Sequence, residues 1–217
     1  MKLILSLIVL CFFSCCAFAQ QEKVATNSKY YVGASLSNIS YMIIKDQSKE
    51  SGSFSPVVFL NAGYQLNKRI ILQAGIGYGQ NKFDGGSIYY KSTDSTIYYN
   101  DYRRTRGIAI PLTLRFTPFN PNKRLQLHGT ASIVPAFGTI KAYRTEEMDG
   151  IKTTTYDADV SEFNLIGTAG LMVNYRLSER FDGYIEGNLI YKNFSGSSNY
   201  ANSRPRSEGL GLNYKLK

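Results

Sequence analysis

The chain has 217 residues and is rich in Tyr, Phe and Gly, with 17, 12 and 19 copies, while its mean hydropathy is -0.21. A formal charge of +9 would suit nucleic acid or an anionic surface, but an export signal and the lack of a basic helix, zinc-finger spacing or aromatic-basic motif argue against nucleic acid. After the first twenty residues no window approaches the roughly 20 apolar residues of a spanning helix, so membrane insertion would require a closed β-barrel.

The first nineteen residues have the three-part layout of a secretory signal peptide. Lys2 precedes an apolar run over residues 3–13, and small residues lead to an expected cleavage between Ala19 and Gln20. A transmembrane anchor is one alternative, but the run is too short to cross roughly 30 Å of hydrocarbon. The sequence therefore predicts a signal peptide over residues 1–19 and one outer-membrane domain over residues 20–217.

All three cysteines lie in the segment expected to be removed: Cys11, Cys15 and Cys16. The pair Ser14-Cys15 leaves a lipoprotein signal as a second alternative, although Phe12 occupies the place where such signals usually carry Leu. After cleavage the domain would have no disulfide and no cysteine-based metal site.

Alternation of apolar and polar residues predicts eight β-strands. In chain order they cover residues 30–44, 58–66, 72–78, 107–116, 125–133, 165–175, 181–191 and 210–216. The pattern is least regular in the first and clearest in 107–116, where even positions are large and apolar and odd positions are small or polar. Each segment is near the roughly 9–11 residues that a tilted membrane-spanning strand needs.

The connections between these strands alternate in length. Tight polar turns are expected at residues 67–69, 120–123 and 178–180, and long loops at about 45–53, 84–105, 144–161 and 193–206. Short periplasmic turns and long extracellular loops are typical of outer-membrane barrels. The predicted fold is therefore all-β, an eight-stranded antiparallel up-and-down transmembrane β-barrel in the cell outer membrane.

Aromatic residues are expected in two girdles where strands cross the membrane interfaces. The strand order places Tyr64, Phe116, Tyr175, Phe181 and Tyr214 near the short-turn end, and Tyr78, Phe137, Phe163 and Tyr191 near the long-loop end. The alternative is a soluble secreted barrel or sandwich that binds an apolar ligand. Its water-facing positions would carry many Lys and Glu, whereas the polar positions here are mainly small, which favours a cramped barrel lumen.

Three segments carry a family resemblance: residues 110–116 (IPLTLRF), 163–175 with Gly-Thr-Ala-Gly at its centre, and 209–216 (GLGLNYKL). They resemble the PorT-like outer-membrane β-barrel domain family of Bacteroidota, which is similar in architecture to OmpA and OmpX barrels. The resemblance implies outer-membrane lipids and the assembly machinery as partners of a monomer, and it implies no ligand. The chain departs from many such barrels by ending in Leu216-Lys217 and not in an aromatic residue.

Several charged side chains are predicted to point into the lumen. They are Arg115, Arg176, Asp182 and Glu186, and we expect Arg115 or Arg176 to pair with Glu186, because buried charges are costly unless paired. Such a pair would plug a narrow barrel; a small pore is the alternative. A second basic group is predicted at the short-turn rim, where it could contact lipid headgroups: Lys68, Arg69, Lys123, Arg124, Arg180, Lys215 and Lys217.

The sequence offers little catalytic chemistry. His128 is the only histidine and its parity places it in the lumen, so we expect no catalytic residue, no metal site and no cofactor. The acidic residues of the third loop are a weak alternative cation site that matches no EF-hand spacing: Glu146, Glu147, Asp149, Asp157, Asp159 and Glu162.

The second long loop is the best candidate for recognition, because Tyr and Arg are favoured where proteins bind partners. Its candidate residues are Tyr89, Tyr90, Tyr98, Tyr99, Arg103 and Arg104. The alternative is that these tyrosines continue strands above the membrane. We therefore expect a non-enzymatic protein with a structural, adhesive or surface-recognition role and an unknown extracellular ligand, with a small pore or transport component as the other function.

Overall fold

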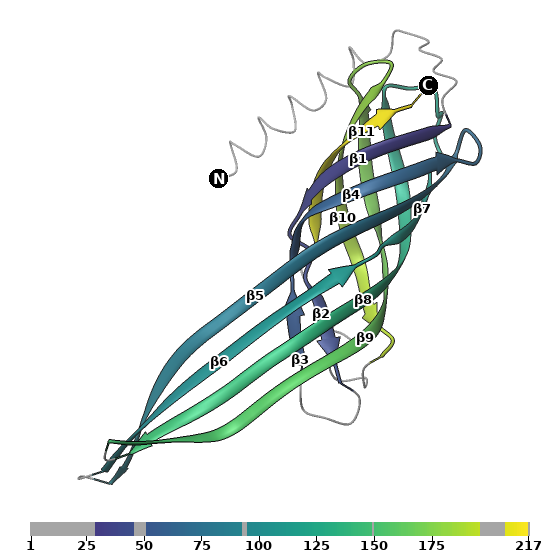
Figure 1. Ribbon diagram of the computed structural model, residues 1–217. Helices are drawn as coiled ribbons and strands as arrows, with labels where there is room; N and C mark the ends of the chain where they lie inside the picture. The colour runs from purple at the N-terminus through teal and green to yellow at the C-terminus, as the bar shows by residue number, and fades with distance from the viewer. Residues whose placement is uncertain (1–28, 46–50, 93–94, 149, 196–206, 217) are drawn as a thin grey trace, which may run out of the picture.

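The computed structural model describes residues 29–45, 51–92, 95–148, 150–195 and 207–216 (Figure 1). The predicted signal peptide, residues 1–19 with the Ala19 and Gln20 cleavage site, lies outside them. The described strands are β1 (Tyr30–Ser37), β2 (Tyr41–Ile44), β3 (Ser51–Phe54), β4 (Pro56–Gln65), β5 (Ile70–Ser92), β6 (Ser95–Ala109), β7 (Leu112–Phe116), β8 (Leu125–Met148), β9 (Ile151–Arg176), β10 (Phe181–Asn193) and β11 (Glu208–Lys215). Within the described ranges, no helix is long and apolar enough to cross a membrane.

The strands close into a ring of eight positions. β1 pairs antiparallel with β4 on one side and with β11 on the other, so the first and last strands meet. β6 and β7 share one position between β5 and β8, interrupted at Ile110 and Pro111, because proline has no N–H for the ladder. The predicted all-β, eight-stranded antiparallel barrel is therefore confirmed, as are its three short turns.

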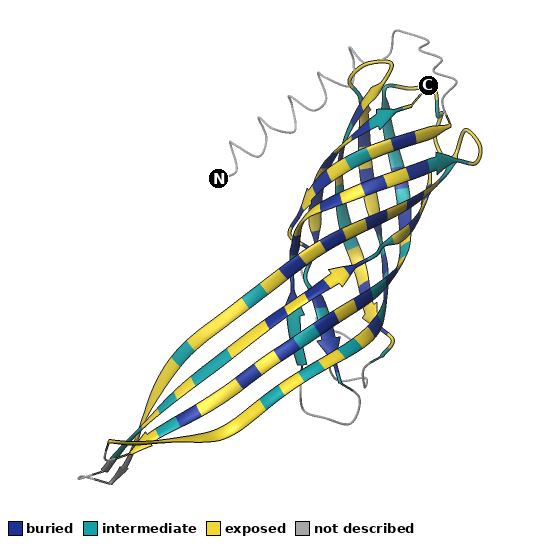
Figure 2. Ribbon diagram, in the orientation of Figure 1, coloured by how far each residue is buried: buried dark blue, intermediate teal, exposed yellow. Residues whose placement is uncertain are grey.

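Buried and exposed residues alternate along the strands of the barrel (Figure 2), and the exposed positions are mainly apolar whereas many of the buried ones are polar. On β4, Leu60 is 62% exposed and its neighbour Asn61 is 6% exposed. This inverts the pattern of a soluble barrel and matches a lipid-facing wall. Phe181 packs on Tyr214 near the short turns, with ring centroids 5.1 Å apart, and Phe137 packs on Phe163 toward the other end at 4.9 Å.

One residue predicted for the lipid-facing girdle, Tyr191, faces the lumen. The β9–β10 register shifts between Asn188 and Ile190, and this bulge reverses the alternation beyond it. Tyr191 consequently points into the lumen, where its hydroxyl accepts a hydrogen bond from the Met42 backbone N–H at 3.0 Å. The expectation that Tyr191 belongs to the lipid-facing girdle is wrong.

The first half of the first predicted strand is confirmed as β1, but its second half and part of the predicted loop form a separate hairpin inside the barrel. β1 ends at Ser37, and β2 pairs with β3 from Tyr41↔Phe54 to Ile44↔Ser51. Ile43 and Phe54 are fully buried against the lumen-facing positions Gly138 and Gly107, where any side chain would clash with them. We call the β2–β3 hairpin the plug, because it fills the lumen at the end away from the short turns.

The plug is held along its free edge by side chains of the barrel wall. Asn164 of β9 forms a reciprocal pair with Ile44, accepting from its N–H and donating to its C=O, both at 3.1 Å. Asn193 of β10 donates to the Met42 carbonyl at 2.9 Å and to Asn164 Oδ1 at 2.7 Å. These amides give β2 the hydrogen bonds that a neighbouring strand would otherwise supply.

Two of the predicted long loops are instead continuations of strands. β5 pairs with β6 as far as Ser92↔Ser95, and β8 pairs with β9 as far as Met148↔Ile151. β6 also pairs with β8 out to Ile97↔Met148, so the four strands form one sheet beyond the barrel (Figure 1). We call this sheet the extension; it comprises residues 80–92, 95–106, 139–148 and 151–161. Of the fourth predicted loop, residues 196–206 lie outside the described part.

Candidate recognition surface and lumen

The extension divides the predicted recognition residues between two faces. Cross-strand partners share a face, and the register runs without a shift from the lipid-facing Tyr78 to Tyr89. Tyr98 and Arg104 therefore lie on the face that continues the outer wall, and Tyr89, Tyr99 and Arg103 on the face that continues the lumen. Tyr90 pairs through its backbone with Thr96, and its side chain is not described.

Stacked rings and ion pairs cover the outer face of the extension. Tyr102 stacks on Tyr143 with ring centroids 4.7 Å apart, and the Lys82 ammonium lies 5.3 Å from the centroid of the Tyr102 ring. Lys141 forms an ion pair with Asp159 across β8 and β9 at 2.8 Å. These contacts order long side chains on an exposed sheet.

The inner face has a bidentate ion pair at its centre. Arg144 donates through Nε and Nη2 to the two carboxylate oxygens of Asp101 at 2.5 and 3.0 Å, and its guanidinium lies 6.0 Å from the Tyr99 ring. The hydrogen bond from Arg144 is the main reason that the pKa of Asp101 falls below its usual value. Around this pair, Phe83 and Tyr89 are 61% and 60% exposed.

Asp182 forms ion pairs with two cationic side chains at the short-turn end of the lumen. Its Oδ2 lies 2.9 Å from Lys215 Nζ, and its Oδ1 lies 3.9 Å from Arg176 Nε. Asp182 and Arg176 are direct cross-strand partners, whereas the predicted partner Glu186 lies four residues further along β10. Arg176 therefore pairs with Asp182 and not, as the sequence led us to expect, with Glu186. Lys215 points into the lumen and does not join the predicted basic rim.

Arg115 has aromatic neighbours where the sequence suggested a carboxylate. Its guanidinium lies 4.9 Å from the centroid of the Tyr184 ring and 5.9 Å from that of Tyr31. Among the described residues, no ion pair joins Arg115 to Glu186, which lines a separate small cavity further into the lumen. Arg115 thus lies beside two aromatic rings, and its attraction to Glu186 acts at longer range than a direct ion pair.

His128 and the acidic residues of the predicted third loop lie in different parts of the structure. The buried His128 shares a hydrogen bond of 3.2 Å with Gln126 Oε1 inside the lumen. Across the described ranges, no three His, Cys, Asp or Glu side chains are grouped as metal ligands would be. The acids of the predicted third loop are spread along β8 and β9, and Asp149 lies outside the described residues.

The sequence reasoning missed the plug and the extension. Lumen-facing glycines at 107 and 138 were a signal for the plug, since they leave room for a buried segment in an already narrow barrel. The tyrosine-rich strand pattern beyond residue 84 was a signal for the extension, and the alternative that these tyrosines continue strands is the one the structure bears out.

Comparisons with known proteins point to one family. The profile of a family described as the outer membrane protein β-barrel domain matches residues 5–215. No curated protein matches the sequence.

Similar solved structures are more distant. Neisserial surface protein A is 15% identical to this chain; the match covers 86% of this chain and 97% of that protein's chain, with a TM-score of 0.39. The N-terminal β-barrel domain of OprF from Pseudomonas aeruginosa is 13% identical; the match covers 88% of this chain and 100% of that domain, with a TM-score of 0.40. A major outer membrane protein from Thermus thermophilus is 13% identical, with the same coverages and a TM-score of 0.43.

Proposed function

Because the chain belongs to the outer membrane protein β-barrel domain family and is a protein of the cell outer membrane, we propose that it is a non-enzymatic surface protein whose extension binds a protein partner outside the cell. Barrels of this kind have short turns in the periplasm and long connections outside, which orients the extension outward. Within the family, we assign the chain to the PorT-like branch on residues 110–116, 163–175 and 209–216.

The observation that supports the proposal is the exposure of large apolar side chains beyond the lipid-facing wall. Tyr89 lies eleven residues past Tyr78 on β5, which is roughly 36 Å along a strand. The exposed apolar and aromatic side chains of the extension are Phe83, Ile88, Tyr89, Tyr98, Tyr143, Met148, Ile151 and Tyr156. Apolar surface that faces neither lipid nor a core marks a contact site.

Charge favours a protein partner over a polyanion. The described cationic side chains of the extension are Lys82, Arg103, Arg104, Arg106, Lys141, Arg144 and Lys152, and the acidic ones are Asp84, Asp101, Glu146, Glu147, Asp157 and Asp159. The numbers nearly balance, so little long-range attraction for a polyanion remains. Tyrosines beside arginines on an ordered sheet are typical of protein-binding hot spots.

Site-specific crosslinking in intact cells tests the proposal. A photoreactive residue is placed at Tyr89 on one face, at Tyr98 on the other, and at Lys68 in a turn at the opposite end as the matched control. We expect a discrete adduct at one or both extension positions and a different pattern at Lys68. The adduct should shrink under proteinase K and weaken when Arg103 and Tyr99 are replaced by Ser. An adduct that resists the protease, or none at either extension position, would overturn binding of a protein partner.

A further inference from the structure

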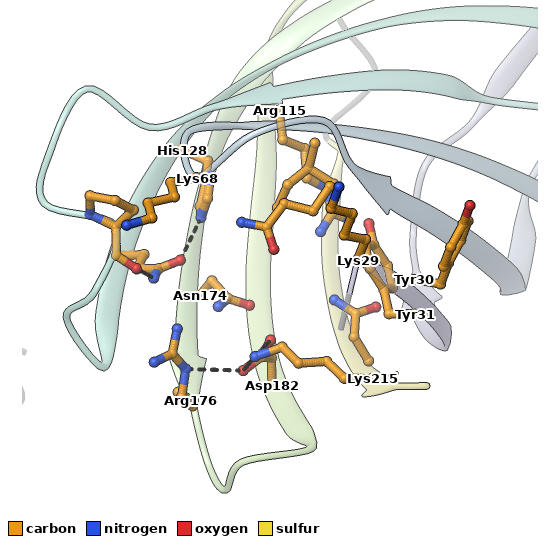
Figure 3. Close-up of a pocket in the computed structure, with 15 residues that line it drawn as sticks. Lys29, Tyr30, Tyr31, Lys68, Arg115, His128, Asn174, Arg176, Asp182 and Lys215 are labelled. Atoms are coloured by element: carbon orange, nitrogen blue, oxygen red, sulfur yellow. Dashed lines mark hydrogen bonds and ion pairs between the residues drawn. The ribbon is translucent and has the colours of Figure 1, made fainter. Parts of the chain in front are cut away.

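The lumen opens at the short-turn end into a strongly basic cavity of about 70 Å³ (Figure 3). Five cationic side chains line it and come from five different segments: Lys29, Lys68, Arg115, Arg176 and Lys215. Asp182 is the one carboxylate among the lining residues that the structure describes. A volume of this size has room for several water molecules or for one small tetrahedral anion.

Arg115 forms the buried part of this cavity. It is 3% exposed, and its Nε and Nη2 have no hydrogen-bond partner within the described structure. The Tyr184 and Tyr31 rings lie against the guanidinium and the Tyr184 hydroxyl is a hydrogen-bond partner of Arg115, but Nε and Nη2 are left without an acceptor in the described structure. Leaving two donors of a buried guanidinium without acceptors is costly, so Arg115 favours an acceptor supplied from the cavity that it lines.

The neighbouring carboxylate is already engaged elsewhere. Lys215 Nζ lies 2.9 and 3.1 Å from the two carboxylate oxygens of Asp182, and Arg176 Nε lies 3.9 Å from Oδ1. Tyr31, next to Arg115, donates its hydroxyl to Gln73 at 2.8 Å. Asp182 and Tyr31 are therefore not acceptors for Arg115 Nε and Nη2, and the cavity that Arg115 lines offers space for a ligand that is.

His128 adds a second buried polar atom without a partner. Gln126 donates through Nε2 to the Lys123 carbonyl at 3.2 Å, which leaves its Oε1 to accept from His128 Nε2. The neutral ring then has an unprotonated Nδ1, which is buried and unpartnered within the described structure. Inorganic hydrogen phosphate carries oxygens for Arg115 and an O–H for such a nitrogen, and a phosphatidylglycerol headgroup carries phosphate oxygens with glycerol hydroxyls beside them, whereas sulfate carries no proton near pH 7.

We propose that this cavity, the basic vestibule, is a binding site for a phosphate group, with the Arg115 guanidinium as its main contact. The site lies at the opposite end of the barrel from the extension and is independent of the recognition function proposed above. The phosphate comes from one of two sources, a soluble phosphate or the headgroup of a phospholipid at the same membrane surface.

Titrations of the full domain, refolded in a detergent without phosphate, test the site and separate the sources. Inorganic phosphate, sulfate and short-chain phosphatidylglycerol are added at constant ionic strength, and binding is followed by calorimetry and by the NMR signals of Arg115 and His128. We expect saturable binding of phosphate or of the lipid, and weaker binding of sulfate. Binding of phosphate itself identifies a soluble ligand, and binding of the lipid alone identifies the headgroup.

Variants assign the binding to the vestibule. Arg115→Gln should weaken it by about 10- to 100-fold, since hydrogen bonds to a charged group are being removed. Lys141→Gln, which removes an exposed lysine from the extension, is the matched control and should bind as the parent does. Heat-modifiable mobility on gels checks that each variant folds, and Arg115→Lys, which keeps the charge, replaces Arg115→Gln if the latter does not. Equal affinity of the Arg115 variant and the parent, or no saturable binding of either probe, would overturn the proposal.

Discussion

Replacing Asn164 with Leu should release the plug from the barrel wall. The side chain of Asn164 is fully buried and forms both hydrogen bonds to the Ile44 backbone, each at 3.1 Å. Leu has a similar volume but no polar atom, so it would strand one buried N–H and one buried C=O. At about 1–3 kcal/mol for each group, the free energy that holds the plug in place should fall by about 2–6 kcal/mol.

Hydrogen exchange measures this loss directly at the Ile44 amide. A fall of about 2–6 kcal/mol corresponds to exchange that is about 30-fold to 10⁴-fold faster. Thr168→Val is the matched control, because Thr168 is also buried in the lumen on β9 and its hydroxyl makes no described hydrogen bond to the plug. If Ile44 exchanges equally slowly in Asn164→Leu and in the parent, the Asn164 pair does not hold the plug and the reasoning fails.

Three further predictions follow from the wall, the lumen and the extension. Leu60→Arg, in the middle of lipid-facing β4, should lower the free energy of unfolding in phospholipid by about 2–4 kcal/mol, as measured by urea titration. Leu66→Arg, beside the short turn, is the control and should lower it by only about 0–1 kcal/mol. Equal losses for the two variants would contradict the membrane placement. The purified protein should give no channel conductance above a lipid-only control in planar bilayers, because the plug fills one end of the lumen and buried side chains such as Tyr31, Arg115 and Tyr184 fill the other; a conducting parent would refute the closed lumen. Arg144→Gln should raise the pKa of Asp101 back toward 3.8 in an NMR titration. In the parent, the Arg144–Asp101 pair should stabilise the extension above pH 3.8, and this stabilisation should be lost as the pH falls through the lowered pKa of Asp101. An unchanged pKa in the variant would exclude the pair as the cause of the lowered pKa.

The wall of the barrel was predictable because each of its strands obeys one local rule. Alternate residues must face lipid or lumen, so segments such as residues 107–116 and 125–133 revealed their facing without any long-range information. The same rule failed at Tyr191, where the bulge after Asn188 inserts one residue. A bulge of this kind leaves no mark in the period-2 pattern until its neighbours are known.

The plug and the vestibule could not be predicted in this way, since both depend on contacts between distant segments. Ile44 and Asn164 are 120 residues apart in sequence, and neither residue type alone suggests the other as partner. Lys215 and Asp182 meet only because β10 and β11 pair in one particular register. Parity placed Arg115 in the lumen correctly, but its neighbours Tyr31 and Tyr184 follow from ring closure.

The position of the plug constrains the order in which the barrel assembles. Its two strands lie between β1 and β4 in the chain, yet the side chains that enclose it come from β6, β8, β9 and β10, which are synthesised later. A hairpin so tightly enclosed would have to enter a finished narrow cylinder from one end. We therefore expect the sheet to wrap around the plug before β1 and β11 join, so that the β1–β11 seam closes last.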